Sequence, residues 1–294
     1  MIAVAQNLVD ALSLGSLYAL IAVGVTILYT VMGLMNFAQG EFIMVPAYVL
    51  YALAGVPFGL AVVAALASGV LLALIADRVA FRPVRAADLS SQLVTSLAVA
   101  TILENLVSSA VAARPQSVAT PTLFAESSSL GSLRVPNLEW LTLGLGAATL
   151  VGLGLLLYRT PIGLQMRAAA EDFEMARLLG VRADRVIAFS FALSGALGAA
   201  VGVILVMQGG QVSPTMGLTP VLVGFVAVVI GGFARLAGAV LGGLLLGALS
   251  SLLGAYLPAG LLPFRDAFVF TIPIAILLVR PQGLLGGAHG EARV

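Results

Sequence analysis

The sequence predicts an all-α fold: a polytopic bundle of about eight or nine transmembrane helices, some of them broken or re-entrant. Hydrophobic residues make up 61% of the 294 residues and charged residues only 9%, whereas soluble domains carry about a quarter charged residues. Several segments approach the roughly 20 apolar residues that a helix needs to cross a bilayer. Runs such as "LGLGAATLVGLGLLLY" are continuously apolar, which favours helices over a β-barrel, because barrel strands alternate in polarity.

Nine apolar windows are the candidate spans of what we expect to be a single transmembrane domain, 1–294. They are 9–31, 37–56, 58–80, 89–112, 138–158, 186–208, 219–233, 236–257 and 266–280. The windows 37–56 and 219–233 are short and interrupted by Gly or Pro, so we expect these two to be broken. No basic residue precedes the first window, unlike the start of a cleaved signal peptide, and we expect the first span to be retained.

The arginines predict the orientation, because cytoplasmic loops carry an excess of basic residues. An alternating chain places eleven of them inside: Arg78, Arg82, Arg85, Arg159, Arg167, Arg177, Arg182, Arg185, Arg235, Arg280 and Arg293. Arg114, Arg134 and Arg265 fall outside. This split predicts an external N-terminus, a cytoplasmic C-terminus, an external loop at 113–137 and a cytoplasmic loop at 159–186.

The cytoplasmic loop contains an amphipathic pattern. Apolar residues recur at spacings of three or four, which is typical of one helix face: Met166, Ala169, Ala170, Phe173, Ala176 and Leu179. Gly180 follows as the expected C-cap. The apolar face could lie on lipid headgroups or in the groove of a partner protein. Acidic residues at 171, 172 and 174 fit poorly against anionic lipid, so we favour a partner.

Within this loop, "EMARLLG" at 174–180 resembles the E-A-A-x-x-x-G loop of ABC importer permeases, with Met175 in place of the first Ala. The surrounding "RTPIGLQMRAAAEDFEMARLLGV" resembles the branched-chain amino-acid permeases, a LivH-like family. Further resemblance lies in "GSLYALIAVGVTILYTVMGLMNFAQGEF", "VSPTMG", "GAVLGGLLLG" and "RPQGLLG". These motifs occur in the family's order and cover nearly the whole chain.

The resemblance implies a permease subunit of a bacterial inner-membrane ABC importer for branched-chain or related amino acids. It implies that Phe173, Glu174, Ala176, Arg177 and Gly180 belong to a helix that couples the permease to an ATPase. The implied partners are a second permease, either a copy or a homologue, two ATPase subunits that bind ATP and Mg, and an external solute-binding protein. The chain itself is then neither an enzyme nor a cofactor-binding protein, and nucleic acid is not a partner.

Two positions depart from the family pattern. Gln39 stands where the family usually has His, so a proton-linked role for that site is not expected. Ala234 and Arg235 stand where a Gly-Ser pair is usual. The second change adds a positive charge to a tight turn on the cytoplasmic side.

The polar stretch "NFAQGE" at 36–41 lies between two apolar windows. Asn36 and Gln39 have the spacing of a capping box, in which each side chain bonds the other residue's backbone N–H, and Glu41 would suit the positive helix start. Pro46 then frees a carbonyl at about position 42. Irregular backbone at membrane depth also lines cavities, so we assign Asn36, Gln39 and Glu41 to the substrate pathway as well.

Other polar residues lie within or at the ends of the windows. Glu104 and Asn105 lie inside the window 89–112, where a charged group is costly and marks a pathway or an interior contact. We assign both to the pathway. Gln208 and Gln211, at an outer helix end, could meet an arriving substrate or simply be solvated.

Three pairs of glycines have the small-x-x-x-small spacing that lets helices pack closely in lipid. They are Gly198 with Gly202, Gly238 with Gly242, and Gly243 with Gly247. We assign these six to helix packing.

Composition limits the alternative functions. The chain has no Lys, so it lacks the Walker loop of ATP-hydrolysing proteins, and no Cys, so it has no disulfide or thiol chemistry. Its one His, His289, lies in the polar tail, and there is no G-x-S-x-G motif; both argue against an intramembrane enzyme. An ion-coupled secondary transporter or channel for a small polar solute remains the alternative, with Glu41 and Glu104 as its charged groups.

Overall fold

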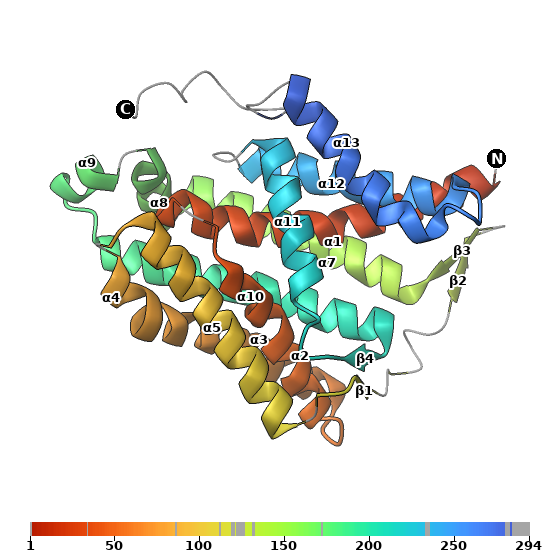
Figure 1. The fold of residues 1–294 in the computed structure, drawn as a ribbon, viewed down its shortest axis with the longest axis horizontal. Coiled ribbons are helices and arrows are strands. Elements are labelled where there is room, and N and C mark those ends of the chain that lie inside the picture. Colours follow the sequence, from red (N-terminus) through yellow and green to blue (C-terminus); the bar gives the residue numbers. More distant parts are fainter. Residues whose placement is uncertain are drawn as a thin grey trace.

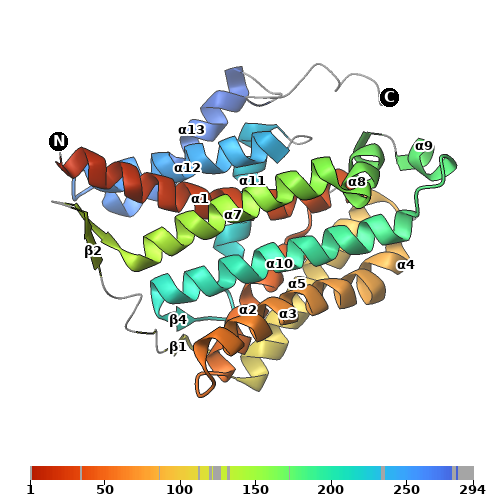
Figure 2. The ribbon, with the colours of Figure 1, turned by 180° about the vertical axis from the view of Figure 1, so that it is seen from behind.

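The computed structural model is a bundle of helices with two small β-sheets at one end (Figures 1 and 2). It describes residues 2–33, 35–85, 87–111, 113–118, 121, 127–130, 133–171, 173–232, 236–279 and 283. Helices account for all nine apolar windows.

The helical elements follow one another in this order: α1 (Ile2–Met32), the 3₁₀ turn η1 (Phe37–Gly40), α2 (Glu41–Ala52), α3 (Phe58–Ala76), the π turn η2 (Asp77–Phe81), α4 (Arg82–Val84), α5 (Leu89–Ala110), α7 (Asn137–Arg159), α8 (Pro161–Glu171), α9 (Phe173–Leu178), α10 (Ala183–Gly209), α11 (Leu218–Gly231), α12 (Leu236–Tyr256), η3 (Leu262–Phe264) and α13 (Arg265–Val279).

Six of these helices are long and apolar enough to cross a membrane, and α11 is a shorter apolar helix. The structure therefore supports six to seven spans by length and composition, fewer than the eight or nine predicted. The difference arises because α2 has 12 residues and α13 has 15, less than the roughly 20 that a complete span requires.

The all-α prediction misses two short sheets. β1 (Gln116–Ser117) pairs antiparallel with β4 (Gln211–Val212), with Gln116 opposite Val212. β2 (Ser127–Leu130) pairs antiparallel with β3 (Leu133–Pro136), with Ser127 opposite Pro136. Both sheets lie at the end of the bundle that holds the N-terminus, away from α8 and α9 (Figure 1). Runs of two to four residues are too short for a periodicity signal in the sequence.

Helices α1 and α10 form the centre of the bundle. In α1, 83% of the most apolar stretch is buried, and in α10 67%, against only 11% in α5. α1 packs on α7, α10, α11 and α12, while α10 also packs on α2 and α3. Their apolar side chains share one core cluster, which includes Leu20, Val23, Leu197 and Val201.

The six glycines that the spacing singled out all lie against the backbone of a neighbouring helix. A Cβ at Gly198 would lie 2.8 Å from the Phe42 carbonyl oxygen, and one at Gly202 would lie 2.3 Å from that of Ile43. In the same way Gly238 faces Gly231, Gly242 faces Ala227, Gly243 faces Ala19 and Gly247 faces Gly15. At such distances any larger residue would force the helices apart.

Pro46 contributes to the contact between Gly198 and Phe42. It lies inside α2 and has no N–H, so it cannot bond the Phe42 carbonyl four residues earlier. This carbonyl is the one that faces Gly198 of α10. The absence of a side chain at Gly198 lets α10 approach the carbonyl that Pro46 leaves without its helical partner.

We predict that Gly247→Ala lowers the melting temperature of the purified protein in detergent, because the new Cβ would lie 2.2 Å from Gly15 Cα. Gly152→Ala in α7 is the matched control, since no atom outside its own helix lies within 4 Å of a Cβ there. Alanine favours a helix over glycine by about 1 kcal/mol, so the control should hold or raise the melting temperature. Equal melting temperatures for the two variants would contradict the packing role.

Candidate functional site

The first candidate region is the segment that joins α7 to α10. Thr160 caps α8: the Gly163 backbone N–H donates to Thr160 Oγ1 at 3.1 Å, and Pro161 occupies the first helical position, which proline favours. The Arg167 guanidinium lies 4.8 Å above the Tyr158 ring of α7. The helix therefore begins at Pro161, five residues before the predicted start at Met166. The signal that could have located it is "TP" at 160–161.

Three residues of the apolar face that we expected a partner to cover are covered by the chain itself, and the side chain of Ala170 lies outside the described residues. Met166, Ala169 and Ala176 are buried in the same core cluster as α1, whereas Leu179, expected on that face, is exposed. The prediction failed here because the loop folds as two helices, α8 and α9, rather than as one. The side chains of Phe173 and Glu174 lie outside the described residues.

A different apolar surface remains exposed on α9 and the turn after it. Leu178 is 81% exposed and Leu179 79%, and Met175 is 52% exposed. Arg177 is exposed beside them. Helix α9 projects from one end of the bundle in both views (Figures 1 and 2). We call Met175, Leu178 and Leu179 the α9 surface.

Gly180 ends this helix in a left-handed conformation, with φ of +90°. Its N–H donates to the Arg177 carbonyl, and the Val181 N–H donates to the Ala176 carbonyl, both at 3.0 Å. This is the Schellman arrangement, which glycine favours at that position. Glycine is favoured at position 180 by this backbone conformation and not by crowding, because no atom lies within 4 Å of where a Cβ would stand. Gly180 therefore ends the helix as the C-cap residue that the sequence predicts.

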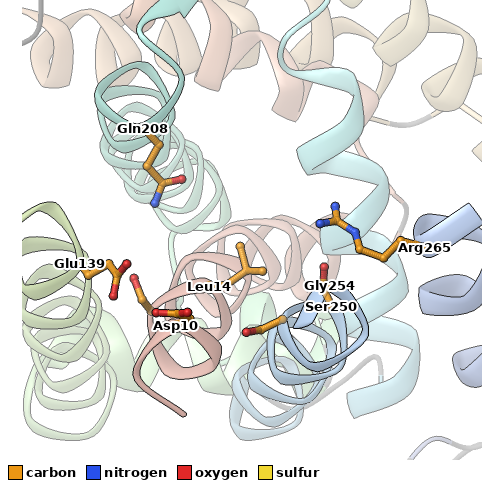
Figure 3. A pocket seen from close by; sticks show the side chains of 9 residues that line it. Asp10, Leu14, Glu139, Gln208, Ser250, Gly254 and Arg265 are labelled. Atoms are coloured by element: carbon orange, nitrogen blue, oxygen red, sulfur yellow. The ribbon is translucent and has the colours of Figure 1, made fainter. Parts of the chain in front are cut away.

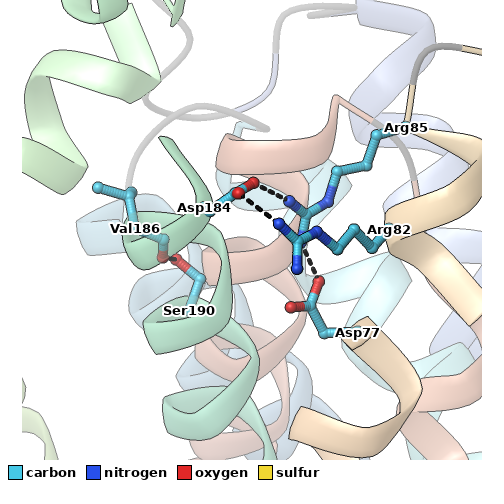
Figure 4. Close-up of polar contacts among 6 residues, drawn as sticks. All are labelled: Asp77, Arg82, Arg85, Asp184, Val186 and Ser190. Carbon is cyan, nitrogen blue, oxygen red and sulfur yellow. Dashed lines mark hydrogen bonds and ion pairs between the residues drawn. The ribbon is translucent and has the colours of Figure 1, made fainter. Parts of the chain in front are cut away.

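An ion-pair network joins the start of α10 to η2 and α4 (Figure 4). Asp184, in the first turn of α10, accepts from Arg82 Nη2 at 2.8 Å and from Arg85 Nη1 at 2.7 Å. Arg85 Nη2 also pairs with Asp77, which is buried. Exposed pairs contribute little to stability, but here two arginines and two carboxylates tie the start of α10 to the α3–α4 connection.

Helix α10 then meets the polar stretch at 36–41 near its middle. Ser194 Oγ lies 2.6 Å from Gln39 Oε1 and 2.9 Å from the Gly24 carbonyl oxygen of α1, so its single hydroxyl hydrogen can bond either oxygen. Gln39 Nε2 donates to the Ser194 carbonyl at 3.5 Å. One serine therefore links three segments of the bundle.

The capping box that the sequence suggested forms only in part. Asn36 is the N-cap of η1, and its Oδ1 accepts from the Ala38 N–H at 3.0 Å. Gln39 does not reach back to Asn36, because its amide is engaged with Ser194. The sequence could not reveal that contact, since the two residues are 155 positions apart.

Glu41 and Glu104 lie close enough for their carboxylates to interact. Glu41 is 7% exposed, and its Oε2 has no hydrogen-bond partner; the Nδ2 of the buried Asn36 also has none. Helix α5 brings Glu104 to this region through its contacts with η1 and α2. The structure thus brings together four of the five expected pathway residues.

Asn105 is the exception. It is exposed, and its Nδ2 donates to the Thr101 carbonyl of its own helix at 2.7 Å. It lies on α5, the least buried of the six long helices.

The contact between Gly40 and Gly217 was not expected from the sequence. A Cβ at Gly217 would lie 2.1 Å from the Gly40 carbonyl oxygen, so the start of α11 packs directly on the end of η1, at the start of α2. Gly217 closes the "VSPTMG" motif, which the resemblance singled out without assigning it a role. The short apolar helices α2 and α11, of 12 and 14 residues, therefore begin at one point.

We predict that Ser194→Ala lowers the free energy of unfolding by about 1–3 kcal/mol, the cost of leaving a buried polar partner unsatisfied. Ser190→Ala is the control, because Ser190 is equally buried in α10 but bonds only the Val186 carbonyl of its own helix (Figure 4). Unfolding of both variants in denaturant measures the difference. Equal losses would show that the link to Gln39 contributes nothing.

Comparison with known proteins identifies the family. Residues 7–278 match the branched-chain amino acid transport system permease component family. The chain is 34% identical to the high-affinity branched-chain amino acid transport system permease protein LivH of Escherichia coli K12, over 97% of this chain and 96% of that protein. It is also 34% identical to BraD of Pseudomonas aeruginosa, over 97% of both chains. A probable LivH of Methanocaldococcus jannaschii is 30% identical over 94% of this chain and 90% of that protein. The chain therefore belongs to the family of permease components of branched-chain amino acid ABC transport systems, whose members are transport subunits and not enzymes.

Proposed function

We propose that this permease forms the translocation pathway of an ATP-driven importer of branched-chain or related amino acids in a bacterial inner membrane. The observation that carries the proposal is the near full-length similarity to permeases named for branched-chain amino acid transport. We further propose that it works with a second permease subunit, two ATPase subunits that bind ATP and Mg, and an external solute-binding protein. The chain has no Lys for a Walker loop of its own.

The α9 surface is the proposed docking site for an ATPase subunit. Its three apolar side chains are exposed. Helix α9 lies at the same end of the bundle as α4 and α8 (Figure 1), and all three helices contain arginine. Phe173, Glu174, Ala176, Arg177 and Gly180, which the resemblance assigns to coupling, belong to the same segment. The first turn of α10 follows this segment closely in the chain, and its Asp184 pairs with Arg82 and Arg85. Movement of the segment would therefore reach α4 through the start of α10.

The proposed pathway passes the point where η1, α2 and α11 meet. Asn36, Gln39 and Glu41 are buried there, level with the middle of α10, and Glu104 faces them from α5. A helix break at membrane depth is tolerated where it lines a cavity or is buried in protein, and transporters use such breaks at their binding sites. Asn105, on the exposed face of α5, would meet the second permease subunit or lipid.

The proposed membrane topology has nine membrane segments, with α2, α11 and α13 as short members that penetrate the bilayer incompletely or obliquely. The N-terminus would then be external and the C-terminus cytoplasmic. Supporting this, α4, α8 and α9 lie at one end of the bundle, and the N-terminus with β2 and β3 lies at the other (Figure 2).

An ion-coupled secondary transporter, the alternative, would function without an ATPase. Reconstitution distinguishes the two. In proteoliposomes that contain the assembled complex, we expect leucine uptake to require ATP on the cytoplasmic side and the external binding protein. Uptake driven by an ion gradient with no ATPase present would overturn the proposal.

We predict that Leu178→Glu abolishes co-purification of the ATPase subunits and ATP-dependent uptake, because a charge would replace an apolar contact at the docking surface. Leu178→Met keeps the side chain apolar and should retain both. Membrane insertion of the two variants is compared by their yield in the membrane fraction. Normal uptake by the glutamate variant would exclude α9 as a docking surface.

The absence of Cys from the chain permits a clean test of sidedness. We predict that Leu178→Cys reacts with a membrane-impermeant thiol reagent only in inside-out vesicles, and Gln116→Cys only in intact cells. Detergent-solubilised protein provides the control for reactivity, since both positions are then accessible. Labelling of position 178 from outside would reverse the proposed orientation.

A further inference from the structure

A cavity of about 270 Å³ opens at the end of the bundle that we assign to the outside (Figure 3). Helices α1, α7, α10, α12 and α13 all contribute to its lining. Its volume is near the lower end of the range for small-molecule sites, about 300–1,000 Å³. It is separate from the buried polar stretch at 36–41, none of whose residues lines it.

We propose that this cavity is the site on the permease that first accepts the transported amino acid, and that it binds the zwitterionic main-chain groups rather than the side chain. This inference rests on the proposed function, since it takes an amino acid to be the substrate. It adds a location and a mode of recognition for that substrate.

One side of the cavity is acidic. Asp10 of α1 and Glu139 of α7 lie next to each other (Figure 3), close enough for their carboxyl groups to interact. Asp10 Oδ1 accepts from Gln6 Nε2 at 3.3 Å, whereas Glu139 Oε2 is buried without any hydrogen-bond partner. An α-ammonium group offers three donors and a positive charge, so it would satisfy these oxygens.

The opposite side is basic. Arg265, at the start of α13, extends its guanidinium toward the cavity (Figure 3). Its Nε and Nη2 bond Asp266 Oδ1 at 3.2 and 3.1 Å, while Nη1 lies beside Gly254 of α12. A guanidinium is well suited to bind a carboxylate. Gln208 and Ser250 supply further polar groups between the two charged sides.

The lining offers little that could select a side chain. Leu14 and Gly254 are the only lining residues without a polar side chain. A site of this composition can hold the ammonium and carboxylate groups that all amino acids share. Selection among branched-chain side chains would then belong to the external binding protein, and the permease would accept what that protein delivers.

The test uses the complete transporter in proteoliposomes, with leucine-loaded binding protein varied in concentration. We expect Glu139→Gln and Arg265→Gln to lower kcat at least about tenfold, because each removes a charge-assisted hydrogen bond to the substrate. The KM for the loaded binding protein should stay within about twofold. Arg114→Gln, an exposed arginine in the outer loop, is the matched control and should transport normally. Valine-loaded binding protein should give the same fold-losses as leucine.

Assembly is checked by co-purification with the ATPase subunits, and Gln208→Ala supplies a neutral second variant should a charge change impair folding. An unchanged kcat in all three variants would overturn the cavity proposal. A raised KM with an unchanged kcat would also overturn it, since these residues would then dock the binding protein. Failure of the unsubstituted complex to accumulate leucine with ATP would instead overturn the proposed function itself.

Discussion

The close approach of α10 to α2 is the contact on which the polar centre of this structure depends. In lipid, apolar side chains gain little by leaving one hydrocarbon environment for another, so helices associate through tight packing and polar contacts. Gly198 and Gly202 allow the α10 backbone to reach the carbonyl oxygens of Phe42 and Ile43. That proximity holds Ser194 against Gln39. A larger residue at either glycine would separate the helices and break this link, so packing and the polar contact are coupled.

The positions of the charged groups also reflect the apolar environment of the bundle. Within the described part of the chain, the ion pairs lie at the two ends of the bundle, around Asp184 and at Arg265. The middle instead contains neutral amides and hydroxyls, with Glu41 and Glu104 as the carboxylates. A buried carboxylate in a bilayer is costly and rarely persists without a role. The cost of Glu41 is therefore the physical reason to relate this region to transport.

The sequence was sufficient to predict features that depend on local pattern. All nine apolar windows are helical, Asn36 is an N-cap and Gly180 is a left-handed C-cap, because each depends on residues within one or two turns. The failures involve contacts between distant segments. Gln39 bonds Ser194 rather than Asn36, and Met166, Ala169 and Ala176 pack on the chain's own core. The cavity unites residues from 10 to 265, which no spacing in the sequence could reveal. The two-residue strands could not be predicted for a different reason: two residues are too few to show the alternation of polar and apolar residues that is typical of a strand.

Helix α10 reaches three polar regions of the molecule. Asp184 in its first turn pairs with Arg82 and Arg85, and Ser194 near its middle contacts Gln39. Gln208 near its end lines the cavity at the opposite end of the bundle. The helix has 27 residues and is therefore about 40 Å long at 1.5 Å per residue. Its interior contains no proline, one of the causes of a sharp kink. If the helix moves as one body, a displacement at one end tilts its whole length. A tilt that moves Asp184 with the α9 segment would shift Ser194 relative to Gln39 and Gln208 relative to Asp10 and Glu139. One helix that moves as a unit can thus relate an event at the α9 end to the geometry of both polar sites, without a chain of separate local changes.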